Sequence, residues 1–362
     1  MRVVIVGPGK VARIHATALA RLPGAALVAV VGRDAARAAA FGGAFGAAPF
    51  TTIDDAATAT HPDVAIVCTP HPRHAGAALA AIERGVHVLV EKPMAVAPDE
   101  ARQMVDAATR AGVRLGVVSQ RRWYEPVRRM KAAIDDGRIG EPILGAVTVL
   151  GWRGPEYYAM DAWRGTWLGE GGGVLVNQAV HQLDLLLWFM GPVRAVSGFW
   201  ANLNHPGMEV EDTAVASLRF TSGALGSIVV SNSQRPGLYA NVHVHGRSGA
   251  SLGVQTDGGS TFVAGVDSPV EPAFNDLWTV PGEAPLLASW QAADRAAAAA
   301  VEITDHYHEL QLRDFLDAVR DGRDPAVAGT DGLAVAELID AVYRAGRGGG
   351  SVTLPESAIL PT

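Results

Sequence analysis

The first third of the chain alternates between short apolar runs and longer stretches of helical character. The β-branched composition of the runs predicts buried strands at residues 1–6, 26–31, 64–68, 86–90 and 113–119. The stretches between them predict helices, of which the clearest cover residues 12–22, 74–84 and 97–111. Strands that alternate with helices in this way are typical of a doubly wound parallel sheet with helices on both faces.

A glycine-rich turn, Gly7-Pro8-Gly9-Lys10-Val11-Ala12, joins the first predicted strand to the first predicted helix. Gly7 permits a tight turn, Gly9 lets the backbone approach a pyrophosphate, and Ala12 allows the helix to pack closely on the strand. The N–H groups at the start of the helix would then bind the phosphates. The turn therefore predicts a dinucleotide-binding Rossmann domain.

The end of the second predicted strand bears on the choice between NAD and NADP. NAD-selective domains carry an acidic side chain here, which binds the ribose hydroxyls. This chain has Gly32, followed by Arg33 and, one helical turn later, Arg37. A glycine leaves room for a 2′-phosphate, and a guanidinium can bind it with two hydrogen bonds. We expect NADP slightly more than NAD, while Asp34 could still supply the acidic group from two positions later.

Two further turns follow strands of the predicted sheet, at the same edge as the glycine turn. Thr69-Pro70-His71 follows the strand at 64–68, and Glu91-Lys92-Pro93 follows the strand at 86–90. Ligands of open α/β sheets bind at this edge. Burial lowers the pKa of an ammonium group, which suits proton transfer by a lysine there. Taken alone, the second turn is more simply a surface ion pair. The proline is expected to fix the turn, and a cis bond is one way in which it can do so.

Beyond Gln120 the pattern changes to strands joined by short turns. Alternating or apolar runs predict strands at 143–150, 195–202, 213–220, 224–231 and 241–245, which form a largely antiparallel sheet. We expect residues 252–304 to be irregular, and helices at 310–320 and 333–343 to close the chain. His306 and His308 are interpreted as surface or subunit-contact residues. The predicted domains are residues 1–121 and 122–362.

A loop rich in aromatic residues lies between the first strand of this second domain and a triple glycine. It contains Tyr157, Tyr158, Trp163, Arg164 and Trp167. Aromatic rings suit a sugar, whose C–H faces lie against them. A packed loop that covers a domain interface is an equally good interpretation.

The triple glycine Gly171-Gly172-Gly173 precedes an apolar stretch that contains three polar residues in helical register. Asn177, His181 and Asp184 stand at i, i+4 and i+7, and would therefore form one stripe on a single helix. A helix this apolar is expected to be buried. The glycines allow a ligand or another backbone to approach closely, so the stripe predicts a site.

Composition and charge narrow the function further. The 362 residues favour two domains, and 49% of them are hydrophobic against 19% charged. The net charge of −7 argues against non-specific nucleic-acid binding and against a basic membrane patch. The single cysteine, Cys68, lies in an apolar run and cannot form a disulfide within the chain. The first apolar run is too short for a signal peptide. We expect a cytoplasmic protein.

The chain resembles the Gfo/Idh/MocA oxidoreductases, named for glucose–fructose oxidoreductase, inositol dehydrogenase and a rhizopine-catabolism protein. The resemblance rests on motifs in the family's order along nearly the whole sequence. These are Gly7–Ala12, Thr69-Pro70 with His74, Glu91-Lys92-Pro93, Gly171-Gly172-Gly173 with Asn177 and His181, Glu211-Asp212-Thr213-Ala214, Phe315-Leu316-Asp317-Ala318 and Gly322-Arg323-Asp324-Pro325.

The resemblance implies NAD(P)-dependent hydride transfer at a carbinol or keto carbon of a sugar, an inositol or a sugar derivative. It implies Lys92 as the acid/base, His181 as the group that orients the reacting oxygen, and Asn177 at a position where many members carry an aspartate. It also implies a homodimer or homotetramer formed through the second sheet. The expected cofactor contacts are Gly7, Gly9, Lys10, Val11, Ala12, Gly32, Arg33, Arg37, Thr69, Pro70, His71, His74, Glu91, Lys92 and Gln120. The expected substrate contacts are Lys92, Arg122, Trp123, Tyr157, Arg164, Trp167, Asn177 and His181.

Two rival functions remain on the same scaffold. Some members hold NAD tightly and oxidise their substrate only transiently, so that a glycosidic bond breaks without net redox change. A cofactor-binding sensor without catalysis is the other. The presence of both Lys92 and His181 argues against the sensor. No metal site is expected.

Overall fold

The computed structural model describes residues 1–257 and 272–354. The chain forms two compact units. The first contains Met1–Gln120 and Thr304–Ala336, and the second contains Arg121–Ile303 and the chain from Glu337 onward. The first unit thus includes residues 304–336, which the sequence analysis assigned to the second domain. No helix in the described part of the chain is long and apolar enough to span a membrane.

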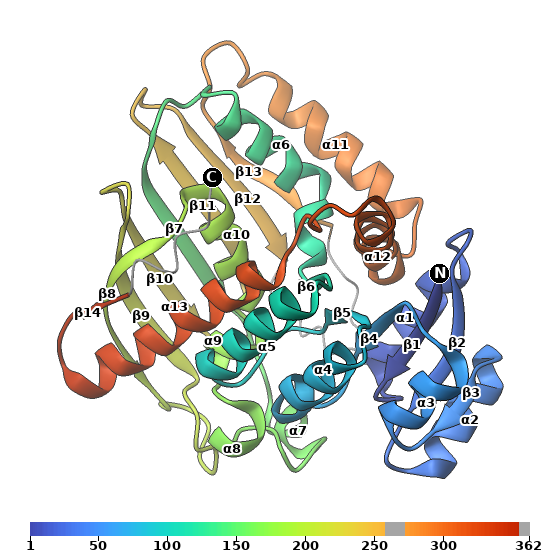
Figure 1. Ribbon diagram of the computed structural model, residues 1–362. Helices are drawn as coiled ribbons and strands as arrows, with labels where there is room; N and C mark the ends of the chain where they lie inside the picture. Colours follow the sequence, from blue (N-terminus) through green and yellow to red (C-terminus); the bar gives the residue numbers. More distant parts are fainter. Residues whose placement is uncertain (258–271, 355–362) are drawn as a thin grey trace. The chain divides into compact units, whose positions relative to one another are not determined.

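The first unit is built on a parallel sheet of six strands in the order β3-β2-β1-β4-β5-β6 (Figure 1). The strands are β1 (Arg2–Val6), β2 (Ala26–Val31), β3 (Ala48–Phe50), β4 (Val64–Val67), β5 (His87–Val90) and β6 (Leu115–Val117). The sequence analysis missed β3 only. The strand order reverses between β1 and β4, and this is the place where doubly wound sheets bind ligands.

Helices connect these strands. They are α1 (Lys10–Ala20), α2 (Ala35–Phe45), α3 (Ile53–Thr60), the 3₁₀ turn η1 (His71–Arg73), α4 (His74–Glu83) and α5 (Pro98–Ala111). Of these, α1, α4 and α5 correspond to the three ranges that the sequence predicted. The strands β1, β4 and β5 are buried throughout their central residues, as in a sheet covered on both faces.

The helix α12 (Ile303–Asp321) completes the core of the first unit. Leu312, Phe315 and Leu316 of α12 belong to the same buried cluster as residues of β1, β4 and β5. The Gln311 amide accepts a hydrogen bond from the backbone N–H of Ser119 (3.0 Å) and donates one to the carbonyl of Val117 (2.7 Å). This side chain therefore satisfies backbone groups at and just after the edge strand β6.

The second unit contains an eight-stranded sheet in the order β13-β12-β11-β7-β10-β9-β8-β14. Its strands are β7 (Pro142–Leu150), β8 (Val193–Ala201), β9 (Thr213–Phe220), β10 (Leu225–Ser231), β11 (Tyr239–Gly246), β12 (Ser251–Asp257), β13 (Phe274–Trp278) and β14 (Val352–Thr353). Among the described strands of this second sheet only β7 and β10 pair in parallel, so the predicted mostly antiparallel sheet is confirmed.

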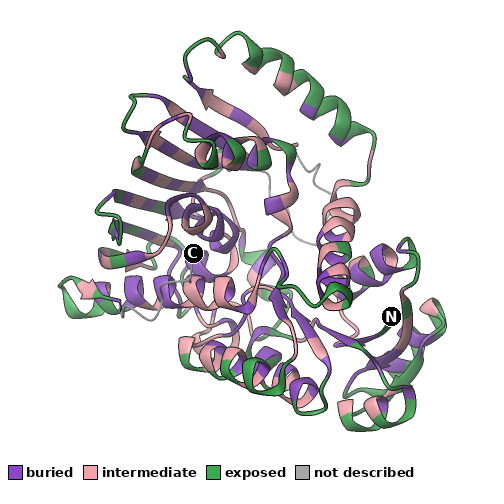
Figure 2. Cartoon of the chain, turned by 45° about the horizontal axis from the view of Figure 1, so that its top comes forward, coloured by how far each residue is buried: buried purple, intermediate pink, exposed green. Residues whose placement is uncertain are grey.

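Buried residues alternate with exposed or partly buried residues along the middle strands of this sheet (Figure 2). Helix α10 (Val180–Met190) packs against β7, and a side chain at Gly145 would collide with Leu186 and Met190 of α10. The remaining helices are η2 (Gln120–Trp123), α6 (Glu125–Asp135), α7 (Pro155–Ala159), α8 (Trp167–Glu170), α9 (Val174–Asn177), α11 (Leu286–Ala299) and α13 (Gly329–Gly348).

Two expectations about the second unit are wrong. Residues 252–304 are not irregular throughout, because β12, β13 and α11 lie there; residues 258–271 are outside the described part of the chain. The expected single helix through Asn177, His181 and Asp184 is divided into α9 and α10. The N–H of Ala179 bonds to the carbonyl of Val174, five residues back, so one extra residue enters the turn and shifts the register of the stripe.

Candidate functional site

The glycine turn has the geometry that a phosphate site requires. Gly7 has φ +100°, and a Cβ there would lie 2.8 Å from the backbone of Cys68 and Thr69, so only glycine fits. Helix α1 begins directly after the turn, and no side chain caps its N-terminus. Its first N–H groups, at Lys10 and Val11, are among those that a helix leaves without an intrahelical partner. Ala12 is fully buried against the sheet.

Packing within the protein is enough to explain why a glycine stands at position 32, directly after β2. A Cβ at Gly32 would lie 2.8 Å from the ring of Pro8, so the glycine accommodates the preceding turn. The carboxylate of Asp34 caps α2 and accepts hydrogen bonds from the N–H groups of Ala36 (3.0 Å) and Arg37 (3.1 Å). Arg33 and Arg37 are both exposed.

The two turns after β4 and β5 are tied together by one buried histidine. His74 Nε2 lies 2.7 Å from the carbonyl oxygen of Thr69, and Nδ1 lies 2.7 Å from that of Pro93. Burial lowers the pKa of His74. The ring of His71, in η1 directly after Pro70, is also buried and lies 5.7 Å from that of His74. The Lys92–Pro93 peptide is cis.

Two buried polar atoms at this sheet edge have no hydrogen-bond partner among the residues that the structure describes. They are Oγ1 of Thr69 and Oε1 of Gln120. A buried polar atom without a hydrogen-bond partner costs free energy in a folded protein, so such atoms are rare. A bound ligand at this edge could supply both partners.

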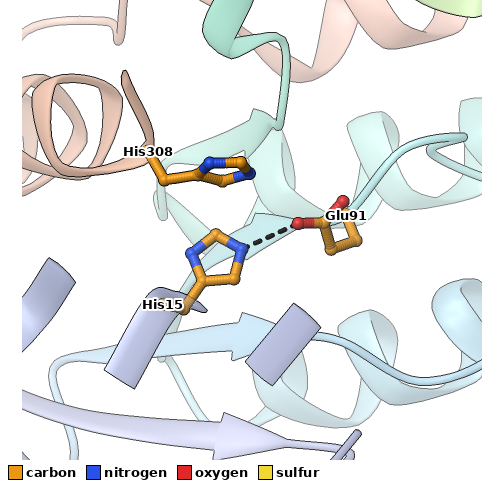
Figure 3. Close-up of side chains that lie close together, drawn as sticks. All are labelled: His15, Glu91 and His308. Carbon is orange, nitrogen blue, oxygen red and sulfur yellow. Dashed lines mark hydrogen bonds and ion pairs between the residues drawn. The ribbon is translucent and has the colours of Figure 1, made fainter. Parts of the chain in front are cut away.

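Glu91 is buried at the end of β5 and is held by two hydrogen bonds. Its Oε1 lies 2.7 Å from Nε2 of His15 on α1, and its Oε2 accepts a hydrogen bond of 3.1 Å from the backbone N–H of Lys92. Burial raises the pKa of Glu91, but the hydrogen bond from His15 and nearby positive charges outweigh it and lower the pKa to about 2. His308 of α12 completes the group (Figure 3). The sequence analysis missed His15, and it was wrong to place His308 at the surface, since His308 is buried.

In the second unit, the triple glycine lies against one buried carboxylate. Glu211 accepts hydrogen bonds from the N–H groups of Gly173 (2.8 Å) and Leu175 (3.0 Å), and from the hydroxyl of Tyr343 (2.9 Å). A Cβ at Gly173 would lie 1.7 Å from the carbonyl oxygen of Glu211, and one at Gly172 would lie 2.1 Å from the Tyr343 hydroxyl. The glycines therefore allow the close approach of protein groups, one of the two reasons expected for them.

Three of the expected substrate contacts, Asn177, Tyr157 and Arg164, are joined by hydrogen bonds at the end of α9. The amide of Asn177 donates hydrogen bonds to the Tyr157 hydroxyl (2.6 Å) and to the Glu170 carboxylate. The Arg164 guanidinium donates to the same hydroxyl and lies 4.4 Å from the centre of the Tyr157 ring. Burial raises the pKa of Tyr157 to about 12, so this hydroxyl stays protonated near neutral pH. The sequence analysis missed Glu170, although its position beside the triple glycine is a usable signal.

Other expected substrate contacts have protein partners instead. The guanidinium of Arg122 is buried and donates to both carboxylate oxygens of Asp184, with 2.8 Å from Nε to Oδ2. Trp167 packs edge-on against Trp200 and Tyr343. Trp123 is half-buried in η2, and His181 is buried in the first turn of α10.

Comparison with known proteins gives a consistent result for both units. A model described as "Oxidoreductase family, NAD-binding Rossmann fold" matches residues 1–119, and one described as "GFO/IDH/MocA C-terminal domain" matches residues 127–251. The WlbA dehydrogenase from Bordetella pertussis, solved with NADH and UDP-GlcNAcA, is 31% identical, with a TM-score of 0.81 over 98% of this chain and 99% of that one. The chain belongs to the Gfo/Idh/MocA family.

Curated relatives of this Gfo/Idh/MocA protein include dehydrogenases of cyclitols and sugars. Inositol 2-dehydrogenase of Rhizobium meliloti is 25% identical over 348 residues, which cover 95% of this chain and 96% of the relative. D-glucoside 3-dehydrogenase of Escherichia coli is 28% identical over 245 residues, which cover 62% and 68%. The family resemblance found in the sequence is confirmed, and the chain is an oxidoreductase of an NAD-dependent family.

Proposed function

We propose that this protein transfers a hydride between a nicotinamide cofactor and a carbinol or keto carbon of a sugar, an inositol or a related carbohydrate. The observation that carries the proposal is the meeting, at one edge of the first sheet, of an uncapped glycine turn and the Glu91-Lys92-Pro93 turn. Relatives named as inositol and glucoside dehydrogenases support a carbohydrate as the class of substrate.

The residues at this edge fit NAD(P) in composition and in shape. The Gly7–Ala12 turn offers backbone N–H groups to the pyrophosphate, because a helix starts there without a cap. The unpartnered Thr69 and Gln120 oxygens would gain partners on the same edge. When bound, the nicotinamide supplies the hydride acceptor or donor. We assign Pro70, His71 and His74 to its neighbourhood, since they follow β4.

Lys92 is the proposed acid/base. During oxidation of the substrate it takes the hydroxyl proton as hydride leaves, and during reduction it returns the proton. His181 is proposed to donate a hydrogen bond to the same oxygen and so to orient it. Asn177 cannot exchange a proton, and its amide contacts with Tyr157 and Glu170 support a positioning role.

For the substrate, we propose Tyr157 and Arg164 as the principal contacts of the second unit. The Tyr157 hydroxyl and the Arg164 guanidinium lie together at Asn177, as hydroxyl-rich ligands require. Arg122 and Trp167 are proposed to support the substrate contacts by packing, because Arg122 already binds Asp184 and Trp167 packs in an aromatic cluster. Trp123, next to Arg122, is assigned the same supporting role.

We also propose NADP in preference to NAD, and a homodimer or homotetramer formed through the second sheet. Arg33 and Arg37 are exposed at the end of β2, where a 2′-phosphate would bind. A cytoplasmic location is part of the proposal, since a lone cysteine suits a reducing compartment.

Replacing Lys92 by Met tests the proposed chemistry. We expect turnover of the best substrate in a sugar and inositol panel to fall by about 10²–10⁴-fold, because general acid–base catalysis is lost. Binding of the cofactor, followed by tryptophan fluorescence, should persist. Lys131→Met, in α6, is the matched control and should keep full activity.

Unchanged turnover in Lys92→Met would contradict the assignment. Reduced nicotinamide should accumulate with wild-type enzyme during oxidation. Product formation without net absorbance change would instead indicate redox-neutral cleavage, and cofactor binding without any turnover would indicate a sensor.

A further inference from the structure

The group His15, Glu91 and His308 is a cluster of three buried titratable side chains, of which the proposed chemistry gives no role to the two histidines. The three residues come from α1, the end of β5 and α12, all within the first unit. In Figure 3 the His15 ring points its Nε2 at Glu91, and His308 lies above both. The two histidine rings meet edge to face at 5.3 Å.

We infer that His15 is a positioning residue for Lys92, which acts by holding the Glu91 carboxylate ionised and fixed at the start of the lysine turn. The inference rests on the proposed role of Lys92 as the acid/base. It adds to that role a second layer, in which α1 controls the charge next to the reacting lysine.

The hydrogen-bond pattern defines what His15 does. Its Nε2 faces Glu91 Oε1 at 2.7 Å, and its Nδ1 is buried without a partner in the described chain. The Nε2–H tautomer is therefore the favoured one, since it donates to Glu91 and leaves only an acceptor unmet. A metal ion bound at Nε2 would require the other tautomer, with a buried N–H donor that nothing accepts. The group is thus better described as a hydrogen-bonded pair than as a metal centre.

His308 supports the pair without carrying charge. Its Nδ1 lies 2.6 Å from the carbonyl oxygen of Thr304, one turn back on α12. Burial and the neighbouring His15 lower the pKa of His308 to about 4, so its ring is neutral at neutral pH. A neutral ring packed on His15 fixes its orientation without competing for Glu91.

The titratable groups near Glu91 come from several elements of the first unit. They are His15 of α1, His308 of α12, Lys92 of its own turn, Cys68 at the end of β4 and His74 of α4. Burial and the Glu91 charge raise the pKa of Cys68, so the thiol stays neutral. Burial also lowers the pKa of His74. Among these groups Lys92 is the one that shares the turn with Glu91, and its positive charge contributes, after His15 and His308, to the low pKa of the Glu91 carboxyl.

Glu91 and Lys92 are coupled through a backbone hydrogen bond and through their opposite charges. Glu91 Oε2 accepts from the Lys92 N–H, which orients the start of the turn. The Lys92 charge contributes to the low pKa of Glu91, and by reciprocity the carboxylate favours the ammonium form of Lys92. If His15 no longer donated, burial would favour the neutral carboxyl, and that support for the ammonium would weaken.

The test compares the pH dependence of kcat/KM for substrate oxidation in His15→Phe, His15→Gln and Glu91→Gln. Phe keeps the ring volume but removes the donor, whereas Gln restores an N–H donor. Glu91→Gln removes the charge. We expect the acidic limb of the profile to move to lower pH by about one unit in Glu91→Gln, and in the same direction in His15→Phe. His15→Gln should restore most of the wild-type profile.

A second readout does not depend on activity. The pKa of Glu91 is lower in the folded chain than in the unfolded one, so its stabilisation is present above about pH 4.5 and is lost as the pH falls towards about 2. His15→Phe should therefore unfold at a higher pH than wild type in an acid titration. His306→Phe, on the same helix as His308, is the control and should change neither readout.

The outcomes separate this inference from the proposed function. A His15→Phe profile that coincides with wild type, or a double variant with Glu91→Gln whose shifts add fully, would overturn the inference while Lys92→Met remains inactive. Full activity in Lys92→Met would overturn the proposed function itself. If His15→Phe fails to fold, the other two variants still test the inference: Glu91→Gln removes the carboxylate and should shift the profile, whereas His15→Gln keeps a donor to the carboxylate and should not. Equal profiles for these two variants would overturn the inference.

Discussion

At the scale of single residues, the chemistry of this protein depends on buried polar groups whose partners lie far away in sequence. Glu91 is paired with His15, Arg122 with Asp184, and Glu211 with Tyr343. Each pair is buried, so breaking it would leave an uncompensated polar group. The sequence identified Glu91 and Arg122 as notable but could not identify their partners.

Glu211 gives a prediction at this scale. Burial raises its pKa to about 7 in the folded chain, above the ordinary value of 4.5. Its contribution to the free energy of unfolding is therefore fully present below about pH 4.5 and is lost as the pH rises through about 7. We would measure the free energy of unfolding in urea at pH 5 and at pH 8. Between these two pH values it should fall by up to about 3 kcal/mol more for wild type than for Glu211→Gln.

The comparison has an internal control. Glu209→Gln removes a nearby exposed carboxylate that accepts a hydrogen bond from the backbone N–H of Trp167, and this variant should follow the wild-type pH dependence. Equal losses in wild type and Glu211→Gln would show that the buried carboxyl does not titrate in this range.

At the scale of elements, turns carry most of the site. The Gly7–Ala12 turn, the turn after β4 and the turn after β5 were predicted because each is short, local and recognisable by residue type. The division between α9 and α10 was not predicted, because one extra residue in a helical turn leaves no mark on the apolar pattern. Helix α11 was missed because its alanine-rich sequence lacks strong periodicity, and β12 and β13 were missed because these short strands stand in a stretch that is alanine- and glycine-rich as a whole.

The turn between β2 and α2 supports a prediction on cofactor choice. We expect NADPH to bind more tightly than NADH in tryptophan fluorescence titrations, because Arg33 and Arg37 are exposed there while Asp34 caps α2. Arg33→Ala should weaken NADPH binding by about tenfold, the loss of one charge-assisted hydrogen bond, and leave NADH binding unchanged.

Arg110→Ala, in the last turn of α5, is the control for loss of a positive charge and should alter neither affinity. Equal or tighter binding of NADH by wild type would contradict the preference for NADP.

At the scale of the whole molecule, the second sheet has one face that lacks a cover in the described chain. Phe199 on β8 pairs with Val215 on β9, which pairs with Val229 on β10, and these side chains are 76%, 47% and 38% exposed. Leu225 and Leu144 form a second such pair across β10 and β7. Contiguous apolar residues on a sheet face mark an interaction surface, which supports the proposed assembly through this sheet.

We expect light scattering coupled to size-exclusion chromatography to give a dimer or tetramer for wild type. Phe199→Asp should shift the protein towards monomers, since it would bury a charge in the contact. Leu168→Asp, at an 89% exposed apolar residue on α8, should keep the wild-type assembly. A monomeric wild type, or a Phe199→Asp variant with unchanged mass, would contradict the assembly through this face.

The sequence by itself determined the alternation of strands and helices, the parallel first sheet, the antiparallel second sheet and the turns that carry Gly7, Thr69 and Lys92. It could do so because apolar periodicity and turn residues act over short distances along the chain. Only the tertiary structure decided that α12 completes the first core, that Glu211 holds the triple glycine, and that His15 binds Glu91. These contacts join residues separated by tens to hundreds of positions, and what makes them necessary is the cost of burying a polar group or an apolar face without a partner.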